Sequence, residues 1–443
     1  MNDISLGFLG SPDESGWFVL RGANQTSGLV SCDYELNPAL KSMVEERISL
    51  NLRGSRQQLR YIVSTLEKLV HTPTDTQLAP LVLRVWSQNR GAYLYSAIMQ
   101  ARLEIEEGQL SSQLAGSMRL HLRIRREGFF FGEEDALPLA NSSGSGTSPL
   151  TVYNHDDNHL GHDNWFSINT SALGLTQPAS LRLEIENNAT GSGLSHFWLG
   201  GLTCSDEESR PTLNSEAENA QGGTVLLSGL ASGGKYCQYR WSGTGWNTLA
   251  SWTLGAVEVS QLKSRALTPV LRFFSPIPDE RLSLRLQIAQ SGTVMWQSPM
   301  MAVEKNVGYF AFEPIQLPLG GLPLQAYAYP HQLILQARHG NSGEHLLEVD
   351  DLLLLPHEPY FRFNALSMLQ NGEKMIVDGR SGLSWSLRDG LEMKTHHQLG
   401  GALRLVPSNK QHFWIFQTDT EAKAAIGRSV KVRAWFRRHW SLP

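Results

Sequence analysis

The chain has 443 residues, of which 41% are hydrophobic and 18% charged, and its net charge is −4. The length exceeds one ordinary core, so we expect about two to four domains, and the apolar content excludes a disordered chain. A weakly negative protein has no overall attraction for nucleic acid or anionic lipid. The 40 glycines and 20 prolines separate short alternating apolar runs, which predicts a mainly β, multidomain protein.

The first residues contain neither the basic segment nor the apolar segment of a signal peptide, and no stretch has the length of an apolar membrane span. We therefore expect a protein made in a reducing cytoplasm. Its cysteines, Cys32, Cys204 and Cys237, lie too far apart for a metal motif and are odd in number. Buried or half-buried free thiols are the expectation.

Residues 1–137 are predicted to form an α+β unit with one helix. Apolar residues recur at helical spacing from Gln57 to Val70, and Ser55 is placed to cap the first turn. The helix should end near His71, before Pro73. Strands are expected on both sides of this helix.

The last predicted strand of this unit, residues 118–126, is apolar on one face and basic on the other. Its cations are Arg119, Arg123, Arg125 and Arg126. Nucleic-acid binding would call for aromatic rings between them, and the strand has none. A solvent-facing or partner-facing edge strand, usable in assembly, is the favoured interpretation.

The rest of the chain is predicted to be β. A Ser/Gly linker at 138–150 leads to a first β-sandwich module at 151–210, which other segments could complete. An acidic connection follows, then a jelly-roll module at 220–357 and a small C-terminal β domain at 358–443.

One short arrangement occurs twice. Pro178 precedes the alternating run Leu181–Glu186, a polar turn and His196; Pro330 precedes Leu333–Ala337, a polar turn and His345. Each copy is a strand, a loop and a return strand. Since no acid, base or nucleophile is duplicated with it, the repeat indicates duplicated architecture, with any recognition in the loops 187–195 and 339–344.

The loop between Asn154 and Asp163 is the candidate metal site, with Asp156, Asp157, His159 and Asp163 as ligands. It fits neither the EF-hand nor the zincin spacing. Asn, Asp and His are also common turn formers. A turn between two strands is therefore the favoured interpretation, and we predict no metal and no cofactor.

Aromatic residues are dense between 236 and 252, and Tyr239, Trp241, Trp246 and Trp252 are the candidates for contact with a glycan or a protein. The competing interpretation places alternate rings in the core of the sandwich. Both remain open at this stage.

The adjacent carboxylates Asp350 and Asp351 suggest a catalytic pair. Neighbouring residues of a strand point to opposite faces, so these two are not expected to flank one bond. The chain also contains no GxSxG, P-loop or CxxC motif. We expect no enzymatic activity.

The order of parts resembles the distal-tail and tail-tip structural proteins of long-tailed bacteriophages. The resemblance is carried by Ile48–Gly54 with the helix after it, by Leu120–Arg126, and near the C-terminus by Gly372–Asp378 and Leu403–Asn409. The family's usual Pro-Gly-Asn turn is here Pro407-Ser408-Asn409. The middle modules resemble the carbohydrate-binding-type jelly rolls that such proteins often carry.

The resemblance implies a split-barrel-like assembly domain and a virion tail protein that forms a ring of three or six copies. Its partners would be itself and other tail proteins, and it would connect the tail tube to the tip or to host-recognition proteins. The alternative is a carbohydrate-binding adhesin that recognises a host surface glycan. Neither hypothesis requires nucleic-acid binding.

Overall fold

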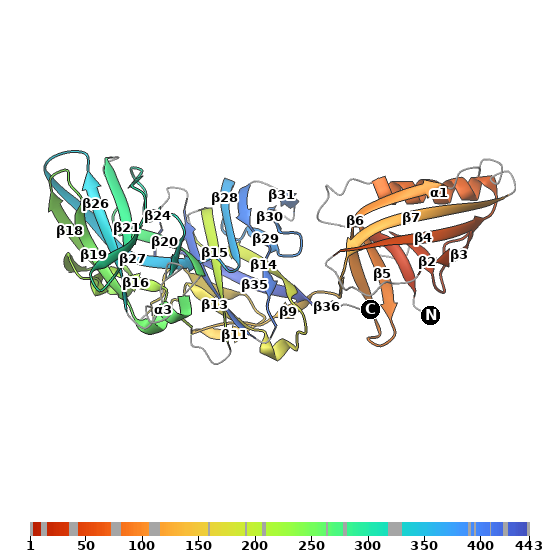
Figure 1. Cartoon of the computed structure of the whole chain (residues 1–443), viewed down its shortest axis with the longest axis horizontal. Coiled ribbons are helices and arrows are strands. Elements are labelled where there is room, and N and C mark those ends of the chain that lie inside the picture. The colour runs from red at the N-terminus through yellow and green to blue at the C-terminus, as the bar shows by residue number, and fades with distance from the viewer. Residues whose placement is uncertain are drawn as a thin grey trace. The chain divides into compact units, whose positions relative to one another are not determined.

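The computed structural model shows a mainly β chain that divides into two compact units (Figure 1). Unit 1 contains Met1–Asp135 and Arg437–Pro443, and unit 2 contains Ala136–Phe436. The structure describes residues 3–440 except 10–15, 35–42, 72–80, 106–115, 158–159, 191–192, 206–209, 263–264, 278–280, 318–329, 389–390, 394–395, 408 and 420–423. Among the described residues, none of the helices is both long enough and apolar enough to cross a membrane.

Unit 1 is a strongly curved antiparallel sheet that nearly closes into a barrel. Its strands run in the order β2 (Trp17–Arg21), β1 (Ile4–Phe8), β5 (Leu81–Ser87), β6 (Ala92–Ile105), β7 (Ser117–Glu127), β4 (Met43–Arg53) and β3 (Leu29–Asp33). The Arg21 guanidinium on β2 donates to the carbonyls of Cys32 and Tyr34, at 3.0 and 3.2 Å. These bonds tie the two ends of the sheet together. The last described strand, β36 (His439–Trp440), returns to unit 1 and pairs with β8 (Phe130–Phe131).

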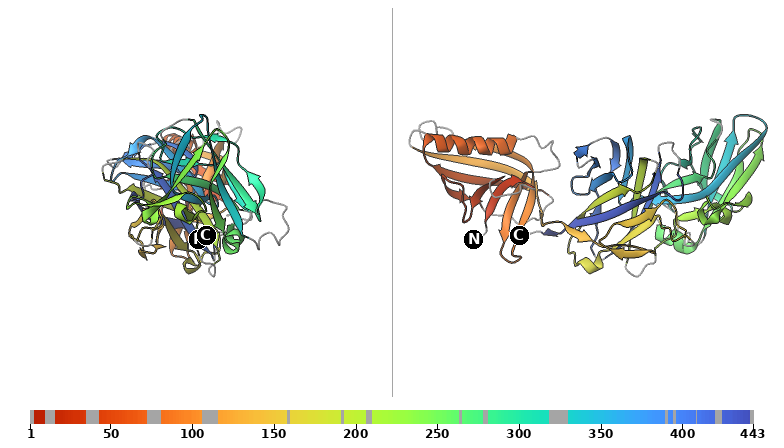
Figure 2. Two further views of the ribbon diagram at one scale, coloured as in Figure 1. Left: turned by 90° about the vertical axis from the view of Figure 1, so that its left-hand side faces the viewer. Right: turned by 180° about the vertical axis from the view of Figure 1, so that it is seen from behind.

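The predicted helix is confirmed as α1 (Arg56–His71), which lies along strand β6 (Figures 1 and 2). Its N-terminus is a capping box: Gln58 N donates to Ser55 Oγ at 3.3 Å, and Ser55 N donates to Gln58 Oε1 at 2.9 Å. The helix buries Leu59, Ile62 and Leu66 against the apolar side of the sheet. Local sequence therefore defines both the start and the buried face of α1.

Unit 2 begins with a two-sheet sandwich, which we call the first sandwich. One sheet has the order β11 (Gly144–Gly146), β10 (Leu139–Asn141), β13 (Trp165–Asn169), β34 (Lys410–Thr418), β15 (Leu194–Cys204), β28 (Tyr360–Leu369) and β32 (His396–Gly400). The other has β12 (Leu150–Tyr153), β35 (Ser429–Arg437), β14 (Ala179–Asn187), β29 (Lys374–Asp378), β30 (Leu383–Arg388) and β31 (Leu391–Met393), with β9 (Asp135–Leu137) and β33 (Arg404–Leu405) at its sides.

This strand pairing differs from the expected division of the chain. We expected a separate C-terminal domain at 358–443, but its strands from β28 to β35 fill the same two sheets as those of 139–204. For example, β12 pairs with β35 through Val152 and Val430. The expected linker at 138–150 is also part of the sandwich, because β10 and β11 form a hairpin there. Gly144 and Gly146 have φ angles of +156° and +155°, which glycine adopts most easily. This strand is therefore rich in glycine and has the composition expected of a linker.

The second sandwich is inserted into the first, between β15 and β28. Its larger sheet contains β17 (Thr224–Leu227), β18 (Lys235–Ser242), β27 (Glu344–Pro356), β20 (Arg265–Phe273) and β24 (Tyr309–Ala311), with β16 (Asn214–Glu216) and β25 (Ile315–Leu317) at its sides. The facing sheet contains β19 (Asn247–Leu254), β26 (His331–His339), β21 (Leu282–Gln290), β22 (Thr293–Gln297) and β23 (Met301–Ala302). Helix α3 (Ala256–Leu262) connects β19 to β20.

The two copies of the repeated arrangement occupy equivalent positions. In the first sandwich β14 and β15 lie in opposite sheets, and in the second β26 and β27 do so as well. Each copy therefore carries the chain from one sheet to the other. The two sandwiches also share one apolar core, in which Trp198 and Phe416 of the first pack with Tyr309 of the second.

Candidate functional site

The prediction that residues 118–126 form an edge strand for assembly is wrong. They belong to β7, which is an interior strand of the sheet in unit 1. It pairs along its length with β4 on one side and with β6 on the other. Arg126 also lies on the opposite face from Arg123 and Arg125, since side chains alternate along a strand. Arg119, Arg123 and Arg125 are exposed on the outer face of the barrel.

Arg126 is fully buried and forms a two-pronged ion pair with Glu46 on β4. Its Nε and Nη2 donate to the two carboxylate oxygens at 2.8 and 2.7 Å, and the Tyr34 hydroxyl donates to the same carboxylate. Burial and the adjacent Glu46 carboxylate raise the pKa of Tyr34, so its hydroxyl remains a donor at ordinary pH. This cluster is structural. It could not be recognised from sequence, because the two charges are 80 residues apart.

The carboxylates of the predicted metal loop are engaged separately. Asp156 lies 3.2 Å from the Arg210 guanidinium, and Asp163 accepts from the backbone N and the hydroxyl of Ser142, at 3.0 and 2.6 Å. The Asp157 backbone pairs with that of His162, and His159 lies outside the described residues. In the described part of the chain, no three His, Cys, Asp or Glu side chains gather as metal ligands.

Three of the four aromatic candidates belong to the core of the second sandwich. Tyr239 and Trp252 are each 2% exposed, and the indole Nε1 of Trp252 donates to the Glu216 carbonyl at 3.0 Å. Trp246 is half-buried in the turn between β18 and β19, and the Arg285 guanidinium covers one face of its ring at 4.1 Å. Trp241 is 8% exposed and lines a cavity.

That cavity, at one end of the second sandwich, has a volume of about 450 Å³. Its apolar lining comes from Trp241, Ile277, Leu282 and Leu346. Its polar lining comes from His339, His345 and the loop 341–344 between them. The structure thus joins two features that the sequence showed separately, the ring of Trp241 and the loop that follows β26.

A pair of histidines organises the polar side of this cavity. The rings of His339 and His345 stack with centroids 3.9 Å apart, and Trp241 lies 5.4 Å from His345. The backbone N of Asn341 donates to His339 Nδ1 at 3.1 Å, and Nε2 of His345 lies 2.9 Å from the Asn341 carbonyl. Both histidines therefore contact the backbone of Asn341, at the start of the loop. Sequence reasoning missed the pair, although a histidine at each end of the loop was a visible signal.

The alternation of side chains predicted that the carboxylates of Asp350 and Asp351 point to opposite faces of the sheet. The structure shows that they do not. The register between β20 and β27 shifts between Arg272 and Phe273, where a β-bulge forms. Both carboxylates consequently face one guanidinium: Arg272 lies 3.4 Å from Asp351 and 4.0 Å from Asp350. Burial and its neighbour Asp351 raise the pKa of Asp350 to about 7.

Glu216 completes this buried acidic group, because it lies directly opposite Asp351 on the neighbouring strand β16. Burial beside Asp351 raises the pKa of Glu216 to about 9. The Ser232 hydroxyl donates to Glu216 at 2.7 Å, and the Ser232 backbone N donates to Asp350 at 2.8 Å. Asp350, Asp351 and Arg272 are only 1–2% exposed, so we assign the group a structural role.

Fold and sites together define a mainly β, multidomain protein with a helix-bearing barrel and two fused β-sandwiches. No protein-family model matches the chain, and the search of curated proteins returned no match. Solved structures show limited similarity. The VP2 subviral particle of infectious bursal disease virus is 12% identical over 59% of this chain and 65% of that chain, with a TM-score of 0.16. The chain thus spans slightly less than two thirds of VP2.

Two carbohydrate-active enzymes show similarity of the same order. An exo-β-1,3-galactanase from Phanerochaete chrysosporium, solved with galactose, is 11% identical over 71% of this chain and 82% of that one, with a TM-score of 0.20. A Paenibacillus xanthan lyase is 9% identical over 81% of this chain and 48% of the lyase, with a TM-score of 0.21. Similarities at this level assign neither a fold family nor an activity to the chain.

Proposed function

We propose that the chain is a structural component of a bacteriophage virion tail, at the distal tail, tip or baseplate. It would assemble into a ring of three or six copies and connect the tail tube to tip or host-recognition proteins. The observation that carries the proposal is the path of the chain. The barrel contains both the first and the last described strands, β1 and β36, and the sandwiches are inserted within it.

This path suits an assembly domain that carries an attached body. The barrel also contains three of the segments on which the resemblance to tail proteins rests, Ile48–Gly54, the helix and Leu120–Arg126. A ring requires each copy to offer two different, complementary surfaces to its neighbours. An end strand with an exposed apolar side chain supplies one such surface.

Strand β3 is our candidate for this surface, through its exposed side chains, because Arg21 of β2 already occupies the carbonyls of Cys32 and Tyr34. It ends the sheet order and pairs with β4, and Val30 beside its bulge is 61% exposed. An exposed valine on an end strand can pack against a neighbouring copy, and a carboxylate at the same position would oppose that packing. Val30 is thus the position at which the ring can be weakened with least damage to the barrel.

Size-exclusion chromatography with light scattering, followed by negative-stain imaging, tests the ring on the full chain. We expect a mass of three or six protomers for the native chain and a shift toward monomer for Val30→Glu. The matched control is Val294→Glu, since Val294 is 48% exposed on β22 of unit 2. A native chain that stays monomeric at high concentration would refute ring formation by the chain alone.

The second candidate function is recognition of a host surface glycan by the second sandwich. The cavity at Trp241 favours it, because saccharides present an apolar ring face together with hydroxyl groups. Trp241 and Leu282 supply apolar surface, and Asn341 and Glu344 supply hydrogen-bonding groups beside it. In this proposal the cavity binds a sugar while the barrel assembles.

A glycan array tests this candidate, and it must use the full chain. A fragment of residues 150–357 would lack the strands between 360 and 437 that complete the first sandwich. We expect saturable binding that Glu344→Gln weakens about tenfold, as the loss of one charge-assisted hydrogen bond predicts. Trp246→Ala is the control, because Trp246 does not line the cavity. A silent array would remove this function and leave the ring proposal intact.

A further inference from the structure

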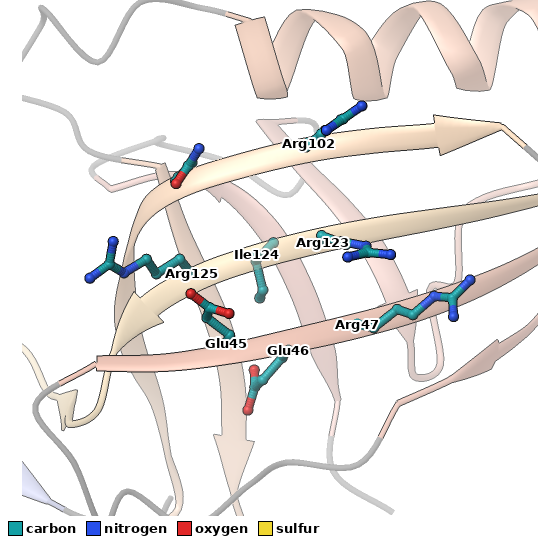
Figure 3. A pocket seen from close by; sticks show the side chains of 8 residues that line it. Glu45, Glu46, Arg47, Arg102, Arg123, Ile124 and Arg125 are labelled. Carbon is teal, nitrogen blue, oxygen red and sulfur yellow. The ribbon is translucent and has the colours of Figure 1, made fainter.

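Three arginines stand in one row across the outer face of the barrel. Arg47 on β4 is directly opposite Arg123 on β7, which is directly opposite Arg102 on β6 (Figure 3). All three side chains are exposed. Neighbouring strands lie about 4.8 Å apart, so the row extends over about 10 Å. Arg125, two residues along β7 from Arg123, faces the same side.

The positive charge of this face exceeds what its own carboxylates neutralise. Glu104 lies 3.0 Å from Arg123 and 4.0 Å from Arg102. Arg47 and Arg125 form no ion pair within the described part of the chain. Like charges placed directly opposite each other destabilise a sheet. The barrel therefore bears a small energetic cost that a bound anionic group would remove.

The arginines line a shallow hollow of about 430 Å³ (Figure 3). The remaining polar lining comes from Glu45, Glu46 and Gln100, and the described residues of the lining include no aromatic ring. A single-stranded nucleic acid would therefore find no stacking surface here, and Glu45 and Glu104 would repel its evenly charged backbone. A protein segment can instead place carboxylates opposite the arginines and neutral groups opposite the glutamates.

We propose that the outer face of β4, β7 and β6 binds an acidic segment of a partner protein. At least two of its carboxylates would each take paired hydrogen bonds from guanidiniums of the Arg47–Arg123–Arg102 row. Carboxylates on one side of an extended strand recur about every 6.8 Å, which matches the spacing between Arg123 and Arg125 along β7. The proposal is independent of ring formation and of glycan binding.

Fluorescence anisotropy on the full chain tests this proposal, with a labelled hexaglutamate peptide at low salt as the probe. We expect saturable binding that weakens at least tenfold in the double variant Arg47→Gln/Arg102→Gln and falls as salt is raised. The matched control is Arg338→Gln, since Arg338 is exposed on β26 of the second sandwich. Its binding should equal that of the native chain.

A second arm uses oligothymidylate with the same number of negative charges as the peptide. Tighter binding of this oligonucleotide than of the peptide would overturn the assignment to a protein partner. Absence of saturable peptide binding, or equal binding by the double variant, would overturn the site itself. Circular dichroism should show the same melting temperature for the native chain and the double variant, so that a loss of binding is not a loss of fold.

Discussion

The buried Glu46–Arg126 ion pair gives the sharpest test of how the barrel is held together. Replacing Glu46 with leucine leaves a guanidinium that is fully buried without its carboxylate, which accepted two of its hydrogen bonds. Removing one partner of a buried pair costs about 3–5 kcal/mol, a large part of the 5–15 kcal/mol that is typical of domain stability. We expect Arg126→Met to cost about as much, because it leaves the carboxylate buried.

The double variant Glu46→Leu/Arg126→Met should recover most of this loss, since an apolar pair of similar volume avoids the desolvation of both charges. A double-mutant cycle then gives a coupling energy of several kcal/mol between the two residues. The exposed Arg125, on the same strand, provides the control: Arg125→Met should change stability by less than about 0.5 kcal/mol.

Hydrogen exchange measured by mass spectrometry suits this cycle, because it reports opening free energies for the barrel separately from those of unit 2. We expect peptides from β4 and β7 to lose protection in both single variants, while peptides from the sandwiches stay unchanged. A cost below about 1 kcal/mol for Glu46→Leu would refute the reasoning, as would a double variant that loses the sum of the two single losses.

Three further predictions concern unit 2. In Gly379→Ala, a Cβ would lie 2.0 Å from the Leu403 carbonyl oxygen, so the backbone must shift. We expect the free energy of unfolding, measured by chemical denaturation, to fall by about 1–3 kcal/mol. The control Gly427→Ala should lose almost none, because its Cβ would meet nothing within 4 Å. Asn154→Ala removes bonds to Gln417 O and N at 2.8 and 2.9 Å and should lower stability by about 2–4 kcal/mol in a thermal melt. The pKa of Glu216 is raised from 4.5 to about 9 in the folded state, so stability should fall as pH rises through this range; Glu216→Gln should flatten the fall in urea titrations, and an unchanged slope would contradict the assignment.

The parts of the structure that sequence predicted are those defined by local spacing. The helix follows from apolar residues at helical intervals and from a serine placed three residues before a glutamine, and the three cysteines are buried free thiols as expected. Alternation likewise identified β14 and β26, whose apolar residues face the cores of their sandwiches. All of these signals lie within about a dozen residues.

The parts that sequence did not predict depend on which strands pair. Val152 and Val430 lie opposite each other although 278 positions separate them, and the local sequence of neither segment indicates its partner. The interior position of β7 is a similar case. A strand with charges on one face can be an edge strand, but it can equally be an interior strand whose charged face points to solvent. The alternation argument failed at Asp350 because of a β-bulge. The bulge adds one residue to β27, and the pattern of apolar and polar residues gives no sign of it.

The candidate cavity shows what this means for function. Trp241 and His339 come from strands in opposite sheets, and about a hundred residues of chain lie between them. A sequence can nominate an aromatic cluster and a loop, as this one does. Only the packing of the sandwich shows that one ring of the cluster meets the loop while the other rings are buried or covered.

The shared core between the two sandwiches also determines how recognition and assembly can be separated. Trp198 and Trp414 are 1% and 0% exposed, and Trp198 meets Tyr309 of the second sandwich with ring centroids 5.9 Å apart. Removing the second sandwich would uncover large rings of this kind, each burying about 150–250 Å², at a cost of several kcal/mol for each ring at about 25 cal/mol per Å². The insertion therefore stabilises the sandwich that carries it, and substitutions in the loop 341–344 are a cleaner way to separate glycan binding from assembly than deletion of the module.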